Sequence, residues 1–308
     1  MVKHVIVSAM RDEAIILTEW LAHHFAVGFD EIYVFTNDCR DKTAEILVEL
    51  SKHYPVRHFD NAPPYRAPTI QQEALRRAKK NKAVNAADWV LHIDADEFVN
   101  VTCGNRRIED LSEMHAEADA IAVAWRLFGN ETVTNWDPGM PSLPQFTMCE
   151  AVPEMERVAF KTMFRLRAFR KFSIHTPKLP VDPEAFKVVN TVGRNMPNAK
   201  MLTRRGSGYP IEDIRLASWE NATINHYHVR PDILQRAKHA RGDANGRSPS
   251  KRKIGSAFYE LANRNETRDE SILYYGPETA RIQAEMRKIP AVSKYEEDSR
   301  AWLLRNYA

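Results

Sequence analysis

Residues 4–36 read HVIVSAMRDEAIILTEWLAHHFAVGFDEIYVFT, two short apolar runs separated by a segment with helical periodicity. Its first run, 4–9, is short, continuous and rich in valine, which is typical of a strand buried on both faces. Apolar side chains then recur at helical spacing over 12–28, where acidic residues open the segment and Gly28 closes it. A second apolar run over 31–36 predicts another strand. The stretch therefore predicts one β-α-β unit.

The same alternation continues to about residue 100. Strict alternation of strands and helices predicts an α/β fold in which a mostly parallel sheet is flanked by helices. Ligands of such sheets bind at the carboxyl ends of the strands. Polar residues follow each of the four predicted strands, so we expect the functional site at that edge. The further elements expected here are helices over 41–53 and 69–83 and strands over 56–60 and 88–94.

The pattern changes after residue 100. We expect one more strand over 119–129, and a half-buried antiparallel strand over 160–169, where apolar and basic residues alternate. Residues 171–230 show no clear period and are expected to be loop-rich. We therefore divide the chain into a domain over 1–230 and a helical, basic C-terminal extension over 231–308.

The composition indicates a globular protein. The 308 residues are 44% hydrophobic and 28% charged, and the formal net charge is only +3, which gives no general signal for nucleic-acid binding. No run of about 18 apolar residues is present to predict a membrane span. Three widely spaced cysteines argue against a disulfide framework. We expect a cytoplasmic protein.

Three carboxylates lie close together in LHIDADEFV, residues 91–99. On a strand, Asp94 and Asp96 point to the same face, and just past its end they could converge at about 5–7 Å. Oxygen ligands of this type suit Mg²⁺ or Mn²⁺, which would relieve the repulsion. Glu97 points elsewhere in a regular strand and needs the chain to turn before it can join them. The alternative is a solvated turn of acids.

Two late histidines are candidate partners for this site. His226 and His228 alternate in NHYHV and would share a face if extended. An imidazole ligand suits Mn²⁺, and we choose His226 as the third metal ligand beside Asp94 and Asp96. The alternative is a pair of ordinary packed histidines. His92, which alternates with Asp94, is expected to have a core or supporting role.

The chain resembles bacterial glycosyltransferase family 2, in the branch that carries a D-x-D-E-F strand end. The stretches that carry the resemblance cover 4–100 strongly and 120–242 in patches. This resemblance implies a GT-A fold, a nucleotide-sugar donor and a divalent metal, with 1–100 as the nucleotide-sugar half and 101–230 as the acceptor half. It also implies that Asp94 and Asp96 hold the metal and diphosphate. The stretches are MRDEAIILTEWLAHHFAVGFDEIYVFTNDCRDKT, ADWVLHIDADEFV and INHYHVRPDILQRAKHARG.

The donor is expected to meet the ends of the first two strands. A nucleotide could meet backbone N–H groups near Ser8, Arg11 and Glu13, before the positive end of a helix. The alternative is that the acids here only cap that helix. The family more usually has Asn-Glu where this chain has Arg11-Asp12-Glu13. By the resemblance, Asn37 and Asp38 approach the uracil or ribose of a UDP-sugar.

A basic segment near residue 240 is the candidate for closing over the diphosphate. Lys238 and Arg241 would neutralise the departing nucleoside diphosphate, with Gly242 as a hinge. The alternative is a solvated helix end, where cations suit the dipole. The basic residues over 247–253 suggest a charged surface that could contact anionic lipid at the inner membrane.

Transfer with inversion needs a carboxylate base for the acceptor hydroxyl. We choose Glu131, which follows a predicted strand and a glycine turn, together with Asp137, over the other carboxylates of the region. Lys161 and His175 match patches of the same family without an assigned role. The other carboxylates considered are Glu150, Glu154 and Glu156.

The sequence thus predicts a metal-dependent glycosyltransferase of surface polysaccharide or lipopolysaccharide synthesis, with a carbohydrate or lipid-linked acceptor. A non-catalytic module that binds a sugar nucleotide is one alternative. A second alternative is an Fe(II) oxygenase, because His92 and Asp94 with a distant His175 or His226 have the composition of a facial triad. That alternative requires a mostly antiparallel β-barrel.

Overall fold

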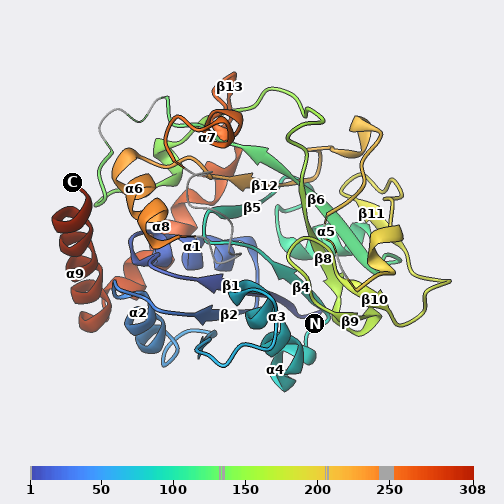
Figure 1. Ribbon diagram of the computed structural model, residues 1–308, viewed down its shortest axis with the longest axis horizontal. Helices are drawn as coiled ribbons and strands as arrows, with labels where there is room; N and C mark the ends of the chain where they lie inside the picture. Colours follow the sequence, from blue (N-terminus) through green and yellow to red (C-terminus); the bar gives the residue numbers. More distant parts are fainter. Residues whose placement is uncertain (1, 132, 134–135, 205, 207, 243–252) are drawn as a thin grey trace.

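A nine-stranded mixed sheet with helices on both faces organises the chain (Figure 1). The computed structural model describes residues 2–131, 133, 136–204, 206, 208–242 and 253–308. Within these residues most neighbouring strand pairs of the sheet are parallel, and the strand order is β3-β2-β1-β4-β8-β6-β12-β5, with β11 beside β6. The predicted α/β class, a mostly parallel sheet flanked by helices, is confirmed.

The first four strands form the parallel part of this sheet. Val5 and Val7 of β1 pack on the face covered by α3, whereas Ile6 packs on the face covered by α1, which explains the continuous apolar run. The elements are β1 (His4–Met10), α1 (Ala14–Val27), β2 (Glu31–Thr36), α2 (Thr43–Leu50), β3 (Val56–Asp60), α3 (Ile70–Lys80), α4 (Lys82–Asn85) and β4 (Trp89–His92).

The chain turns sharply after β4. The expected strand over 88–94 ends at His92, and the N–H of Glu97 donates to the carbonyl of Asp94 at 3.1 Å. A new strand, β5 (Glu97–Val101), begins at once and lies at the edge of the sheet opposite β3. The helix α5 (Ile108–Met114) follows it. The acidic cluster therefore occupies a turn between two strands.

The rest of the sheet is mixed. β8 (Phe160–Arg165) lies antiparallel between β4 and β6 (Ala120–Leu127). The prediction of a half-buried strand is wrong, because both faces of β8 are covered and even Lys161 is buried. β12 (Ala222–His226) pairs with β6 and β5, so the region expected to be loop-rich also supplies a buried strand of the sheet. Shorter strands are β7 (Met148–Cys149), β9 (Phe169–Lys171), β10 (Lys178–Pro180), β11 (Val188–Asn190) and β13 (Thr267–Arg268).

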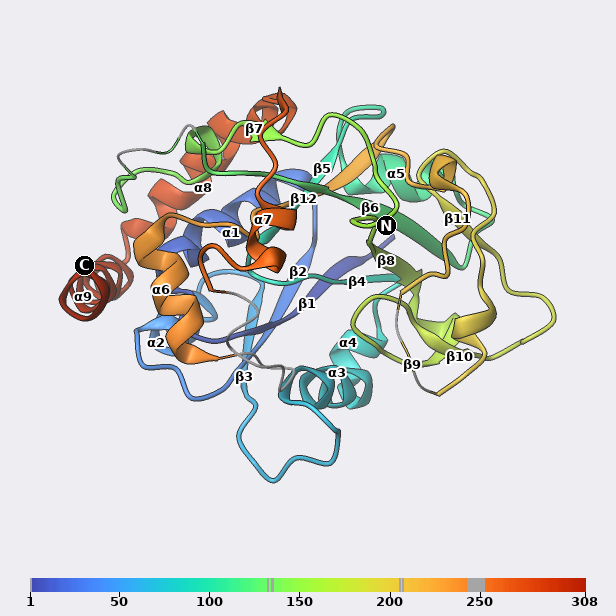
Figure 2. The same ribbon diagram turned by 45° about the horizontal axis from the view of Figure 1, so that its top comes forward.

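The C-terminal region is helical, as expected. Its helix α8 packs on α1, and α9 packs on α2 and α6 (Figure 2). Met286 and Val292 share one hydrophobic core with Trp20 of α1. The boundary at residue 230 remains a prediction. The helices are α6 (Asp232–Arg241), α7 (Ala257–Ala262), α8 (Gly276–Arg287) and α9 (Pro290–Tyr307). Of the helices in the described ranges, none combines the length and apolarity needed to cross a membrane.

Candidate active site

A cavity of about 530 Å³ opens at the carboxyl ends of the parallel strands. This is the edge at which the β-α alternation places a ligand. Polar side chains line the cavity together with apolar side chains from β6 and α7. The predicted site residues that line it are Arg11, Glu13, Asn37, Asp94, Asp96, His226, Lys238 and Arg241.

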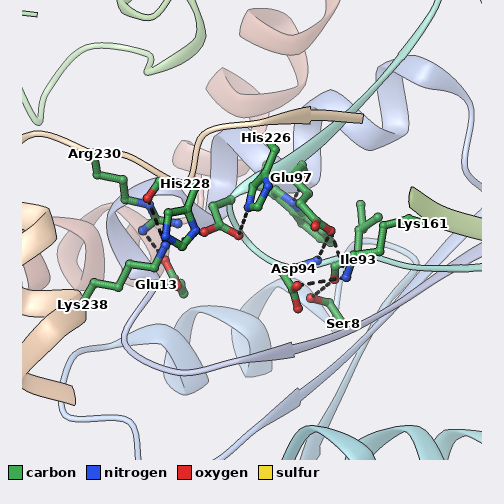
Figure 3. A network of polar contacts seen from close by, with 12 residues as sticks. Ser8, Glu13, Ile93, Asp94, Glu97, Lys161, His226, His228, Arg230 and Lys238 are labelled. Atoms are coloured by element: carbon green, nitrogen blue, oxygen red, sulfur yellow. Dashed lines mark hydrogen bonds and ion pairs between the residues drawn. The ribbon is translucent and has the colours of Figure 1, made fainter. Parts of the chain in front are cut away.

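Asp96 lies at the centre of a buried polar cluster in this cavity. One of its oxygens accepts a hydrogen bond from Lys238 Nζ at 2.6 Å, and the other lies 3.7 Å from His226 Nε2. Asp96, His226 and His228 each present one ligand atom within 4.8 Å of the others. Burial disfavours ionisation of Asp96, but Lys238 and His226 hold its pKa well below the usual range. Figure 3 shows both histidines turned toward this cluster.

Asp94 faces a different set of partners. One of its oxygens accepts a hydrogen bond from Gln71 Nε2 at 2.5 Å. The other accepts from Lys161 Nζ at 3.0 Å (Figure 3). Burial opposes ionisation, but the Lys161 ammonium lowers the pKa of Asp94 to about 2. The structure thus brings Asp96 and His226 together, adds His228, and keeps Asp94 with Lys161 outside this three-residue group.

Glu97 joins Asp94 because the chain turns between them. Its carboxylate accepts the N–H of Asp94 at 2.8 Å and lies 3.2 Å from Lys161 Nζ. Burial, opposed by Lys161 and assisted by the charges of Asp94 and Asp96, raises the pKa of Glu97 to about 8. Lys161, whose side chain is 0% exposed, is therefore shared by two carboxyl groups.

Two histidines near Asp94 are engaged in the scaffold. His92 Nδ1 donates to the carbonyl of Val7 at 2.8 Å, so its Nε2 accepts from Gln71 at 3.1 Å. Both nitrogens of His92 are therefore used, in line with a supporting role. His175 Nδ1 contacts the carbonyl of Phe160 at 3.0 Å, and its ring packs against Trp125.

Glu13 is ion-paired with two arginines, and its side chain does not cap helix α1. Its carboxylate is ion-paired with Arg230 at 2.7 Å and with Arg241. Arg241 also donates to the backbone carbonyl of Arg11. The first N–H of α1, at Ala14, is bound by the side chain of Asp41. A C-terminal helix is thereby attached to the end of β1.

Four predicted site residues are not among the described residues that line the cavity. Ser8 is buried, and its hydroxyl donates to the carbonyl of Ile93, linking β1 to the acidic turn. Asp38 lies in the loop after β2, where it accepts from Asn37. Glu131 is exposed, and its N–H donates to Asn265. Asp137 is exposed and accepts the N–H of Gly139 in a local turn. The structure does not bring the two chosen bases, Glu131 and Asp137, to the cavity.

Several lining residues were missed at the sequence level. Gln71 and Gln72 stand in the first turn of α3, and α3 begins at the same edge of the sheet as the ligand site. That rule of topology could have identified them. Phe258 and Leu261 of α7 also line the cavity, and both are partly exposed; no local motif marks them.

No family model and no curated protein matches the chain. Among solved structures, TarS 1-349 of S. aureus is 16% identical over 54% of this chain and 48% of that one, with a TM-score of 0.33. The chain thus spans about half of that structure. A TarS 1-349 complex with UDP-GlcNAc aligns over 99% of this chain and 89% of that one, at 12% identity and a TM-score of 0.35.

A third similar structure is glucosyl-3-phosphoglycerate synthase of Mycobacterium tuberculosis, in complex with Mn²⁺, UDP and phosphoglyceric acid. It is 18% identical over 40% of this chain and 43% of that one, with a TM-score of 0.29. At this level of similarity none of these structures identifies a family for the chain.

Proposed function

We propose that the protein is a metal-dependent glycosyltransferase that moves a sugar from a nucleotide-sugar donor to an acceptor hydroxyl. One observation carries the proposal. At the carboxyl ends of parallel strands, the cavity places the group of Asp96, His226 and His228 beside cationic Lys238 and Arg241. Such a site combines ligands for a cation with counter-charges for a diphosphate.

The donor set fits a divalent transition metal. One carboxylate oxygen and two imidazole nitrogens suit Mn²⁺, whereas Mg²⁺ prefers oxygen ligands alone. Among the described residues, the buried Nδ1 of His226 has no hydrogen-bond partner, so this histidine can still offer a ligand atom. We therefore favour Mn²⁺ of the two expected metals, held by Asp96, His226 and His228. When bound, such an ion supplies Lewis-acid stabilisation of the leaving nucleoside diphosphate.

The remaining polar wall suits the donor, which we take to be a UDP-sugar from the family resemblance. Arg11, Lys238 and Arg241 supply positive charge for the diphosphate. Asn37, at the end of β2, offers an amide to the nucleoside. Asp94 is held by Gln71 and Lys161, which fix one carboxylate at the cavity wall toward the sugar or ribose hydroxyls.

For the acceptor base we propose Glu156. Of the five carboxylates considered from the sequence, it is the one found among the described residues that line the cavity. Its side chain is exposed, and Trp125 and His175 lie on the wall of the same cavity. A carboxylate in this position would favour inversion. A carbohydrate or lipid-linked acceptor, and a role in surface polysaccharide or lipopolysaccharide synthesis, follow from the resemblance alone.

The structure does not support the Fe(II) oxygenase alternative. That alternative required His92 and Asp94 as iron ligands, but both ring nitrogens of His92 are engaged by Val7 and Gln71. It also required a mostly antiparallel barrel, and the first four strands of this sheet are parallel. A non-catalytic module would use the same cavity as the enzyme. Only turnover of the donor distinguishes the two functions.

The test is release of free nucleotide from a panel of UDP-, GDP- and CMP-sugars with Mn²⁺. We expect one donor to be turned over, EDTA to stop the reaction, and Asp96→Ala to lower the rate by about 100-fold or more. Glu117→Ala, an exposed acid on another surface, is the matched control and should keep full activity. Donor binding without turnover would favour the module, and dependence on Fe(II) and 2-oxoglutarate would reject the transferase.

A further inference from the structure

Lys238 contacts the acid that we assign to the metal. Its Nζ donates to Asp96 at 2.6 Å and to the backbone carbonyl of His228 at 3.2 Å. The side chain is only 4% exposed, although it comes from a helix 142 residues away along the chain. A buried ammonium thus neutralises Asp96 from within the protein.

The same carboxylate belongs to the candidate cation group with His226 and His228. Lys238 therefore contacts two of the three members of that group. A dication bound by these residues and an ammonium hydrogen-bonded to Asp96 would lie within a few ångströms in a buried site, where like charges repel strongly. The two cations are expected to exclude each other at Asp96.

A displaced Lys238 would still face the cavity, because it lies on the cavity wall together with Arg241. The two residues are three positions apart on α6 and so share one face of the helix. Arg241 is ion-paired with Glu13 at the end of β1. The proposed function places the diphosphate of the donor in this same cavity.

We propose that Lys238 is an exchangeable counter-ion of the metal site. In the metal-free protein its ammonium neutralises Asp96; when a divalent cation binds Asp96, the ammonium is transferred to the donor diphosphate. The exchange keeps the Lys238 ammonium paired both in the metal-free protein and in the complex with metal and donor. It rests on the proposed function and adds a coupling to it: metal and donor each strengthen binding of the other by the same factor.

The test compares Mn²⁺ affinity, by isothermal titration calorimetry, in the full-length wild type, Lys238→Met and Lys238→Gln. Removing the competing ammonium should tighten Mn²⁺ binding by about 10- to 100-fold, the range of a charged hydrogen bond. Affinity for UDP in saturating Mn²⁺ should fall in the same variants. Arg236→Met, an exposed cation on the same helix, should change neither constant. If Lys238 had a purely structural role, its substitution would weaken the binding of both Mn²⁺ and UDP.

The outcomes separate the inference from the proposed function. If the wild type binds Mn²⁺ and the Lys238 variants bind it equally or more weakly, the exchange is wrong while the metal site stands. If neither binds Mn²⁺, the metal site and the exchange both fail.

A measurement on the wild type avoids any folding defect of the variants. Amine-reactive labelling followed by mass spectrometry should find Lys238 protected without metal, reactive with Mn²⁺, and protected again when UDP is added. Lys161 should stay protected throughout and serves as the internal reference. Protection of Lys238 that does not change with Mn²⁺ would overturn the exchange.

Discussion

Two lysines neutralise the carboxylates of one acidic turn, and they do so from very different parts of the fold. Lys161 lies on β8 in the middle of the sheet and is shared by Asp94 and Glu97. Lys238 lies on α6 and contacts Asp96. Both ammonium groups are buried, yet of these three carboxyl groups only Asp96 belongs to the candidate cation group.

The difference lies in what holds each lysine. The backbone of Lys161 is fixed by strands on both sides, since β8 pairs with β4 and β6. The helix that carries Lys238 packs chiefly on α9, another helix. A strand at the centre of a sheet cannot shift without breaking two ladders, whereas a packed helix can slide or rotate. We infer that Lys161 is a permanent counter-ion and Lys238 an exchangeable one.

The two lysines should differ most in their contribution to stability. Lys161→Met leaves the partly exposed Asp94 and the buried Glu97 without their shared ammonium and should lower the free energy of unfolding by about 3–5 kcal/mol in urea titrations. Lys238→Met should cost clearly less, because His226 and Arg230 still lie near Asp96. Lys52→Met, at an exposed pair with Glu49, is the matched surface control and should be close to neutral. Equal losses of stability in the Lys161 and Lys238 variants would contradict the assignment of one permanent and one exchangeable counter-ion.

A smaller effect is expected from pH, through Glu97. Its folded pKa of about 8 lies above the ordinary value of 4.5, so between these values the folded state binds more protons than the unfolded state. Stability from this group must therefore fall as pH rises, with a slope of at most about 1.4 kcal/mol per unit. Burial lowers the pKa of His23, His92 and His175 to about 4, so their opposite contribution ends near pH 6.5.

Between about pH 6.5 and 8 the fall should thus be visible in urea titrations and absent in Glu97→Gln. A flat or rising profile in the wild type over this window would show that Glu97 is ionised when folded.

The sequence predicted the parallel half of the fold because its periods are local. Residues 4–92 alternate between helical and apolar runs, and every strand expected there was found. β12 could not be recognised, because Ala222–His226 has two polar residues and a histidine in five positions and is buried only through its neighbours β6 and β5. Such pairing between distant segments leaves no local pattern.

The candidate site, too, could be predicted from the sequence only in part. The strand-end rule located the edge of the sheet, and the D-x-D pattern marked Asp94 and Asp96. Period two alone put both carboxylates on one face, but the chain turns at Ala95, so each acid meets a different lysine. Lys161 sits in an alternating segment that resembles a surface strand, and its burial follows only from the strands on either side.

We propose that Asp96, His226 and His228 form the cation site. Pulsed electron paramagnetic resonance of bound Mn²⁺, with nitrogen-15 labelled histidine, tests it most directly. We predict coupling to two imidazole nitrogens in the wild type and in Asp94→Asn, to one in His226→Gln and in His228→Gln, and no bound Mn²⁺ in Asp96→Asn. Bound Mn²⁺ without imidazole coupling, or its loss in Asp94→Asn, would contradict the account.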